Sequence, residues 1–283
     1  MRIGSFSIGG TETYGIFTKD GIVNLGPRLG ALYPDLLSLI RGGGLSKVKD
    51  AVRGADPDLS YSDIKYLPLM TRPTNIYCAG RNYHDHVAEM REGAVPPEFP
   101  RMFIKTMGAL VGHDEAVVKP KASDCFDYEA ELAVVIGKDG RHIRKENALD
   151  HVAGYTCLMD GSMRDWQQRT TDLGKNFWRS SSIGPWMVTP DEVPTDRTTW
   201  KIQGRLNGQV MQSSNIGLLV HGIEDLIENY STMTELKAGD VIATGTCSGV
   251  GHARKPPVYL KPGDVFEIEI DGIGVLRNPV VGE

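Results

Sequence analysis

An acidic segment that runs directly into an apolar one constrains this chain more than any other stretch. Residues 127–131 read Asp-Tyr-Glu-Ala-Glu, and residues 132–137 are apolar without a break. Because residues two apart point to the same face of a strand, Asp127, Glu129 and Glu131 would form one acidic row. The apolar continuation predicts a strand that is covered on both faces. Buried like charges repel one another, so the row needs a neutralising partner.

A divalent cation bound through oxygen atoms is the simplest partner for this row. Carboxylates suit magnesium, manganese or calcium. The alternative is a solvated strand face, because glutamate and aspartate are mostly exposed in proteins. The apolar continuation favours the metal, and both interpretations stay open at this point.

Length and composition are those of an ordinary globular chain, which favours a small-molecule ligand. The 283 residues suffice for one large core or two unequal domains. A net charge of -5 argues against nucleic acid or an anionic membrane as partner. No apolar run approaches the roughly 18 residues of a membrane span, and residues 1–5 lack a signal-peptide core, so we expect a cytoplasmic protein. The four cysteines are widely spaced without a Cys-x-x-Cys pair, which predicts reduced thiols.

The order of the predicted elements divides the chain at about residue 70. Residues 1–70 are expected to form a small N-terminal domain, with a hairpin from strands at 13–17 and 21–25 and a helix at 32–41. In residues 71–283 strands dominate, without a regular alternation with helices. The strands are predicted at 75–79, 101–106, 116–118, 129–136, 155–159, 186–188, 201–206, 241–243 and 265–270, and the helices at 145–151 and 216–230. This pattern predicts a β-rich α+β fold.

A short segment after the first strand of the larger domain could supply a catalytic base. If Asn82 caps a short helix, His86 and Glu89 share one face, so the carboxylate could orient the imidazole. Such a histidine suits a general base acting on water near neutral pH. His84 and His86 could instead bind a transition metal, or both could lie on the surface, which base rates of exposure favour. The proline-rich loop at 93–100 suits a mobile lid or an inert connector.

Later segments hold further candidate site residues. Asp160 ends an apolar strand, from which it could supply a third oxygen ligand beside the acidic row. Arg164 and Gln167 are three residues apart and could face a ligand carboxylate together, with Lys175 as a second cation. The small residues of 243–251 follow a strand and would let a ligand approach backbone N–H groups, as an oxyanion site requires. The cysteine in this segment has no evident base, which favours an inert thiol over a nucleophile.

Taken together, these segments resemble the fumarylacetoacetate hydrolase superfamily, and specifically its acylpyruvase-like branch. Each matching piece is weak alone, but the ordered set is specific. The pieces are residues 80–83 with 85, 86 and 89, then 103–105, 128–132, 160 with 164–167, 174–175, and 244–246 with 249–251. The resemblance implies a mixed β-sandwich roll, usually dimeric, behind a small N-terminal domain, in agreement with the strand-rich α+β prediction.

The resemblance also implies a role for each matched side chain. Glu129, Glu131 and Asp160 are similar to the family's magnesium or manganese ligands, with calcium as an alternative occupant. His86 and Glu89 resemble the lid pair that activates water. The residues implied to hold the substrate's carboxylate and oxo groups, or the developing oxyanion, are Arg81, Arg164, Gln167, Lys175 and Thr246, of which Lys175 is also implied to be catalytic.

Two segments depart from the family's common pattern. Many members have Asn-Asp-Val-Ser-Ala-Arg-Asp where residues 159–165 read Met-Asp-Gly-Ser-Met-Arg-Asp. The aspartate and the arginine are kept while their neighbours change. Cys247 stands where a proline is common. The metal site is therefore still expected, and the acyl part of the substrate stays open.

From the resemblance we expect a metal-dependent hydrolase that cleaves a C–C bond in an acylpyruvate or a related 2,4-dioxo acid. The cation would chelate the 2-oxo acid and stabilise the released enolate, and His86, oriented by Glu89, would deprotonate the attacking water. Alternatives that need no attacking water are a decarboxylase, an isomerase or a dehydratase of a 2-oxo acid; another is a silent 2-oxo acid binding protein. The expected partners are a small 2-oxo acid and a second copy in a homodimer, with no nucleic acid and no membrane.

Overall fold

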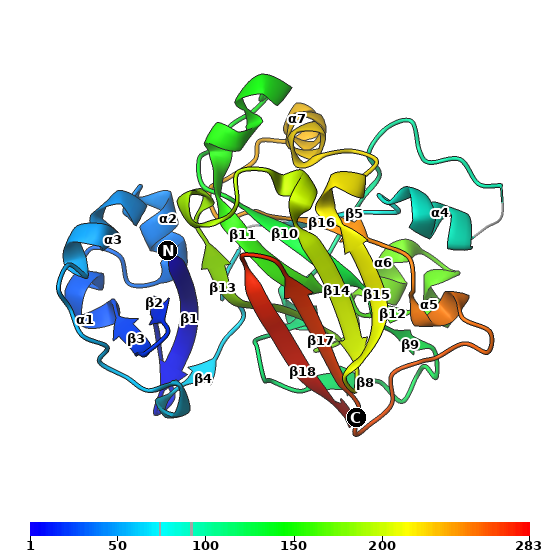
Figure 1. Ribbon diagram of the computed structural model, residues 1–283, viewed down its shortest axis with the longest axis horizontal. Coiled ribbons are helices and arrows are strands. Elements are labelled where there is room, and N and C mark those ends of the chain that lie inside the picture. Colours follow the sequence, from blue (N-terminus) through cyan, green and yellow to red (C-terminus); the bar gives the residue numbers. More distant parts are fainter. Residues whose placement is uncertain (74, 91–92) are drawn as a thin grey trace.

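The computed structural model describes residues 1–73, 75–90 and 93–283 (Figure 1). Its largest sheet contains β1 (Arg2–Ile8), β2 (Thr11–Thr18), β3 (Gly21–Asn24), β4 (Lys65–Tyr66), β5 (Ile76–Ala79), β6 (Met102–Ile104), β7 (Leu110–Val111), β10 (Ala130–Ile136), β11 (Val152–Met159), β13 (Ser181–Val188) and β16 (Val241–Thr246). The strand order is β3-β2-β1-β13-β11-β10-β16-β5-β6, with β4 beside β1 and β7 beside β13. β10 therefore lies inside this sheet, between β11 and β16.

A second sheet packs against the first and completes a sandwich. It contains β8 (Val117–Lys119), β14 (Lys201–Leu206), β15 (Gln209–Asn215), β17 (Val265–Ile270) and β18 (Gly274–Gly282), in the order β15-β14-β17-β18-β8. Figure 1 shows these strands stacked over β10 and β11. A short pair, β9 (Phe126–Asp127) with β12 (Ser162–Met163), lies beside the sandwich. The prediction of a β-rich α+β sandwich is confirmed.

The central strand β10 is buried along its whole length. Its even-numbered residues, such as Leu132 and Val134, pack in the core between the two sheets. Ala133 and Val135 point to the other face, into a core shared with the N-terminal lobe. A strand covered on both faces is mostly apolar, which explains the unbroken apolar run that follows Glu131 in β10.

The N-terminal lobe consists of a hairpin with short helices, shown in blue in Figure 1. α2 (Leu36–Arg41) begins at Asp35, whose side chain accepts from the Ser38 N–H at 2.6 Å while the Ser38 hydroxyl accepts from the Asp35 N–H. This capping box places the start of α2 at Leu36, and the helix was expected from residue 32. β1 joins the main body through the pair Ile3 and Met187 on β13. A domain boundary at residue 70 stays a prediction.

The helices are few and short, and they lie at the edges of the sheets. They are α1 (Gly26–Leu29), α3 (Leu45–Ala51), α4 (His84–Met90), α5 (Arg164–Gln167), α6 (Thr171–Lys175) and α7 (Ile223–Met233), with 3-10 turns at Tyr61–Asp63, Met107–Ala109, Lys145–His151, Pro190–Glu192, Arg197–Thr199, Ile216–Leu218 and Gly251–Ala253. The helix expected over 216–230 is split, because Gly222 starts a new helix by donating its N–H to Asp225 at 3.0 Å. None of the described helices is long and apolar enough to cross a membrane.

Candidate active site

Three buried carboxylates meet where β10 begins and β11 ends. Antiparallel pairing sets Ala130 opposite Met159, and the Asp160 N–H donates to the Glu129 carbonyl at 3.0 Å. Glu129, Glu131 and Asp160 therefore converge, and one oxygen of each lies within 4.8 Å of the others. The sequence placed all three residues in one site, and the structure brings them together.

Asp127 does not belong to this group, so the expected row of three acids is wrong. The strand is interrupted after β9, and Asp127 pairs with Ser162 of β12 instead of continuing into β10. Its side chain turns away and accepts from Arg164 Nε at 2.8 Å and from the Gly251 N–H at 2.8 Å. The period of two residues that predicts a common face holds only within an unbroken strand.

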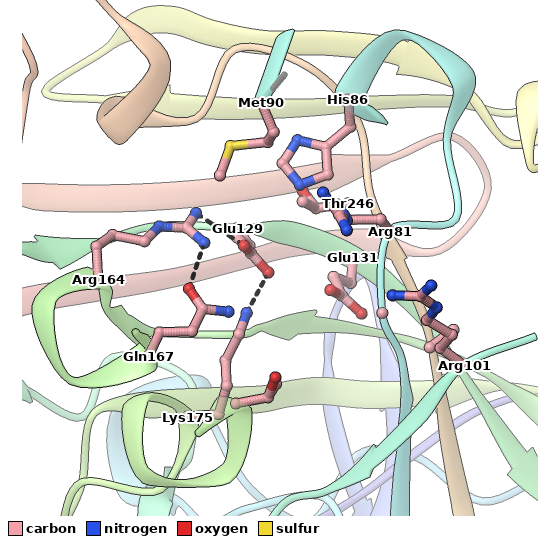
Figure 2. Close-up of a pocket in the computed structure, with 13 residues that line it drawn as sticks. Arg81, His86, Met90, Arg101, Glu129, Glu131, Arg164, Gln167, Lys175 and Thr246 are labelled. Atoms are coloured by element: carbon pink, nitrogen blue, oxygen red, sulfur yellow. Dashed lines mark hydrogen bonds and ion pairs between the residues drawn. The ribbon is translucent and has the colours of Figure 1, made fainter. Parts of the chain in front are cut away.

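Three buried cations surround the carboxylates. Lys175 Nζ donates to Glu129 at 2.6 Å and to Asp160 at 2.8 Å, and Arg164 Nη2 lies 2.8 Å from Glu129 (Figure 2). Lys105 Nζ lies 2.8 Å from Asp160 Oδ1, yet that oxygen accepts no aligned hydrogen bond within the described residues. Four buried acids, with Asp127 included, thus face three buried cations. One negative charge is left over.

The surplus charge falls on Glu131. Burial opposes ionisation of Glu129, but Lys175 and Arg164 bring its pKa down to about 2. Burial and the repulsion of Asp160 and Glu129 raise the pKa of Glu131 well above its usual range. A divalent cation would relieve this repulsion, and oxygen donors suit hard cations. The unaligned Asp160 Oδ1 and the surplus charge both show that these three residues fit such an ion.

The pair of His86 and Glu89 lies on α4, above the carboxylates. His86 Nδ1 is 2.8 Å from Glu89 Oε1, and the other Glu89 oxygen accepts from the Gly249 N–H at 2.9 Å. Beside a carboxylate Nδ1 carries the proton, which leaves Nε2 as a base. His86 is only 4% exposed, so the surface interpretation is wrong for it, while His84 is exposed and lines no shared site with His86.

Asn82 does not cap α4, which begins at His84. The Asn82 amide instead donates to the carbonyls of His221 and Thr244, each at 2.9 Å. Its oxygen accepts from the His221 N–H at 2.9 Å. Asn82 therefore anchors the start of the helix to two distant segments, which no local pattern shows.

The small residues at the end of β16 and in the loop after it orient the site's acids rather than forming an open oxyanion pocket. Gly245, at φ +97°, donates its N–H to Glu131 at 2.9 Å, as Gly249 does to Glu89. The Thr246 hydroxyl donates to the Ala130 carbonyl and accepts from Gln212. These groups are therefore already engaged. The cysteine that follows is fully buried, and burial raises the pKa of its thiol to about 12, as an inert residue requires.

A cavity of about 290 Å³ opens over the three carboxylates (Figure 2). Eight of the expected site residues line it, and the other two, Glu89 and Asp160, contact the lining residues His86 and Lys175. The lining residues are Ala79, Gly80, Arg81, His86, Met90, Arg101, Glu129, Glu131, Arg164, Gln167, Thr171, Lys175 and Thr246. Arg164 Nη1 donates to Gln167 at 3.0 Å, so this pair faces the cavity together, as their spacing predicted.

Two residues of the site have no role in the sequence-based prediction. Lys105 is buried, and besides Asp160 it contacts the Ser181 hydroxyl at 2.9 Å and the Lys175 carbonyl. Arg101 lines the cavity just before β6. Lys105 directly follows the apolar triplet 102–104 and belongs to the matching piece 103–105, to which no role was assigned, and the position of Arg101 gave no signal.

The chain belongs to the fumarylacetoacetate hydrolase family. The family model described as "Fumarylacetoacetate (FAA) hydrolase C-terminal" matches residues 75–281. The fold and the buried carboxylate cluster agree with the resemblance carried by the sequence motifs. The match begins at the strand that was expected to open the larger domain.

Named relatives of this chain are enzymes with different reactions. The mitochondrial oxaloacetate tautomerase FAHD2A of Homo sapiens is 42% identical over 268 residues, which is 92% of this chain and 84% of that protein. A solved fumarylacetoacetate hydrolase from Exiguobacterium antarcticum superposes with a TM-score of 0.82 at 32% identity, covering 100% of both chains. Maleylpyruvate hydrolase from Sphingobium sp. SYK-6, solved with manganese(II) and pyruvate, has a TM-score of 0.82 at 30% identity and covers 100% of this chain and 99% of its own. This chain is therefore an enzyme of the family, whose members differ in reaction.

Proposed function

We propose that this enzyme interconverts the keto and enol forms of a small 2-oxo dicarboxylic acid, with oxaloacetate as the substrate and Mg²⁺ or Mn²⁺ as the cofactor. The observation that carries the proposal is a buried, carboxylate-oriented histidine facing a small cavity whose lining includes four cationic side chains. Its 290 Å³ lies at the small end of the range for ligand cavities, about 300–1,000 Å³. Met90 is the one large apolar side chain among the described lining residues, so little surface suits a long acyl chain. Relatives named as oxaloacetate tautomerases support the choice of substrate.

The side chains of this chain can carry the proton in both directions. His86 Nε2 takes a proton from the carbon next to the 2-oxo group, and the C–H electron pair moves to form the C–C double bond. The C=O π electron pair moves to the 2-oxo oxygen, which receives the proton from the His86 imidazolium to give the enol, and the reverse sequence restores the ketone. Glu89 stabilises the imidazolium that exists between the two transfers, because it holds Nδ1–H at 2.8 Å.

Other residues hold the substrate during this transfer. Arg164 and Gln167 face the cavity as a linked pair, so they can bind the carboxylate beside the 2-oxo group. Lys175 adds a positive charge on the same side. Glu129, Glu131 and Asp160 would hold the divalent cation, which as a Lewis acid polarises the 2-oxo group when bound.

Hydrolysis of a C–C bond in a small acylpyruvate, the leading expectation from the sequence, is the second candidate. The intact pair of His86 and Glu89 favours it, because an imidazole oriented in this way can deprotonate water as readily as carbon. The likeness to maleylpyruvate hydrolase gives further support. Decarboxylation of a 2-oxo acid stays a prediction. The homodimer also stays a prediction, and analytical ultracentrifugation would test it by measuring the mass of the particle in solution.

Product analysis on enol oxaloacetate separates these reactions. With Mg²⁺ present, we expect the enzyme to accelerate the loss of enol ultraviolet absorbance without releasing pyruvate. His86→Ala should slow this step by about 10²- to 10⁴-fold, the usual contribution of a general base. Release of pyruvate at the same rate would identify a decarboxylase. If the enzyme does not accelerate the loss of enol oxaloacetate but cleaves acetylpyruvate or maleylpyruvate, it is a hydrolase and not a tautomerase.

A further inference from the structure

Two arginines line the cavity with side chains that are not engaged by the part of the chain that the structure describes. Arg81 and Arg101 are both exposed, and neither guanidinium makes a hydrogen bond or an ion pair with any residue of the described ranges. Arg164 and Lys175 differ, because both are already bound to Glu129. The positive charges of Arg81 and Arg101 are therefore available to a ligand.

The backbone places these two arginines beside each other at the mouth of the cavity. β5 and β6 pair with Ala79 opposite Met102, and the Gly80 N–H donates to the Arg101 carbonyl at 3.1 Å. Arg81 follows this junction in the left-handed region, at φ +50°, a conformation that a residue with a Cβ adopts rarely. Such strain is typical of sites where a side chain must be held in one place.

Arg81 and Arg101 lie across the cavity from the residues that would hold the 2-oxo acid end. In Figure 2 both arginines are on the side of Glu131, while Arg164, Gln167 and Lys175 lie on the opposite side. A ligand that spans the cavity thus meets cations at both of its ends. A carboxylate at this end could bind both guanidinium groups, whereas a methyl group would leave them without a counter-charge.

We propose that Arg101, with Arg81, forms a subsite for the second carboxylate of the substrate, so that the enzyme selects dicarboxylic over monocarboxylic 2-oxo acids of the same length. This proposal rests on the proposed function for the identity of the other end of the ligand. The unpaired guanidinium of Arg101 is the group that determines the specificity. Removing it should cost affinity only for ligands that carry the distal charge.

Two unreactive ligands test the subsite directly. Malate and 2-hydroxybutyrate share a four-carbon 2-hydroxy acid skeleton and differ only at the last carbon, which is a carboxylate in one and a methyl group in the other. Isothermal titration calorimetry of the Mn²⁺-loaded enzyme should show malate binding at least about tenfold tighter. Arg101→Leu should remove most of this preference and leave the affinity for 2-hydroxybutyrate unchanged. Arg101→Lys should keep part of it, because the charge stays but the planar fork is lost.

Arg141→Leu is the matched control, since Arg141 is also exposed and lies on the loop after β10, away from the cavity lining. It should bind both ligands as the wild type does. The subsite is disproved if Arg101→Leu weakens the binding of both ligands equally. It is also disproved if the wild type does not bind malate or binds it no more tightly than 2-hydroxybutyrate. Neither ligand is turned over, so a preference for malate supports the subsite even where enol oxaloacetate is no substrate. If the enzyme turns over enol oxaloacetate but shows no preference for malate, the subsite is disproved and the proposed function stands.

Discussion

Asp127 and Arg164 are joined by a hydrogen bond of 2.8 Å beneath the carboxylate cluster, and both side chains are buried. The Asp127 carboxylate also accepts hydrogen bonds from the backbone N–H groups of Tyr128, Gly251 and His252, at 2.8–3.0 Å. One carboxylate thus connects β9, α5 and the loop after β16. It fixes the position from which the arginine reaches the cavity.

Asp127→Asn should destabilise the protein strongly. The amide N–H group would face N–H donors that now bind a carboxylate oxygen, and Arg164 would lose its full counter-charge. Breaking a buried ion pair in this way lowers the free energy of unfolding by about 3–5 kcal/mol. Asp124→Asn is the matched control, because the Asp124 side chain is 97% exposed and should change the value by less than about 0.5 kcal/mol. Urea unfolding of both variants makes the comparison. Equal stability of the two would show that the Asp127 network does not support the fold.

Gly249→Ala should impair catalysis by displacing the loop that holds Glu89. Gly249 has φ +100°, and a Cβ there would lie 2.1 Å from the Met211 carbonyl oxygen, so the backbone must shift. We expect a loss of about tenfold in kcat and about 2 kcal/mol in stability. Gly263→Ala is the control for the cost of placing alanine at a positive φ without a clash, since Gly263 has φ +94° and no atom lies within 4 Å of the added Cβ. Full activity in the Gly249 variant would mean that Glu89 needs no support from this loop.

Glu115 should make stability depend on pH in the acidic range. Burial opposes its ionisation, but hydrogen bonds from Arg179 at 2.8 Å and from the Gly112 N–H at 3.2 Å lower its pKa below the usual 4.5. A lowered folded-state pKa means that the stabilisation is present above pH 4.5 and is lost as the pH falls through the folded-state value.

Glu115→Gln tests this dependence. At pH 7 the variant should be less stable than the wild type by about 1 kcal/mol, and the difference should shrink towards pH 3. Glu146→Gln, at a carboxylate that is 64% exposed, should show no such trend. A constant difference for Glu115→Gln at all pH values would show that packing, and not charge, is lost. Thermal unfolding between pH 3 and pH 7 provides the data.

The fold and the centre of the site could be predicted from the sequence because their signals are local. The acidic residues Glu129 and Glu131 precede an apolar run that only a doubly covered strand explains, and Asp160 ends the next long apolar strand. Antiparallel pairing of two consecutive strands then brings these ends together. The spacing of His86 and Glu89 likewise needs only one helical turn.

The rest of the site depends on contacts between distant segments, for which a single sequence carries no signal. Lys105 meets Asp160 across 55 positions of the chain, and Asn82 meets Thr244 across 162. Asp127 was expected to face the metal because period-two reasoning assumes a continuous strand. The break after β9 is set by its pairing with Ser162 of β12.

Glu129, Glu131 and Asp160 are expected to bind one divalent cation that the reaction requires. Mn²⁺ titrated into chelator-stripped protein, followed by isothermal titration calorimetry, tests it most directly in the wild type and in Glu131→Gln, which keeps the side-chain volume but removes one anionic ligand. We predict one Mn²⁺ per chain in the wild type and binding at least about 100-fold weaker in the variant. Equal binding in the two proteins, or undiminished turnover of enol oxaloacetate by stripped protein in the presence of chelator, would contradict the account.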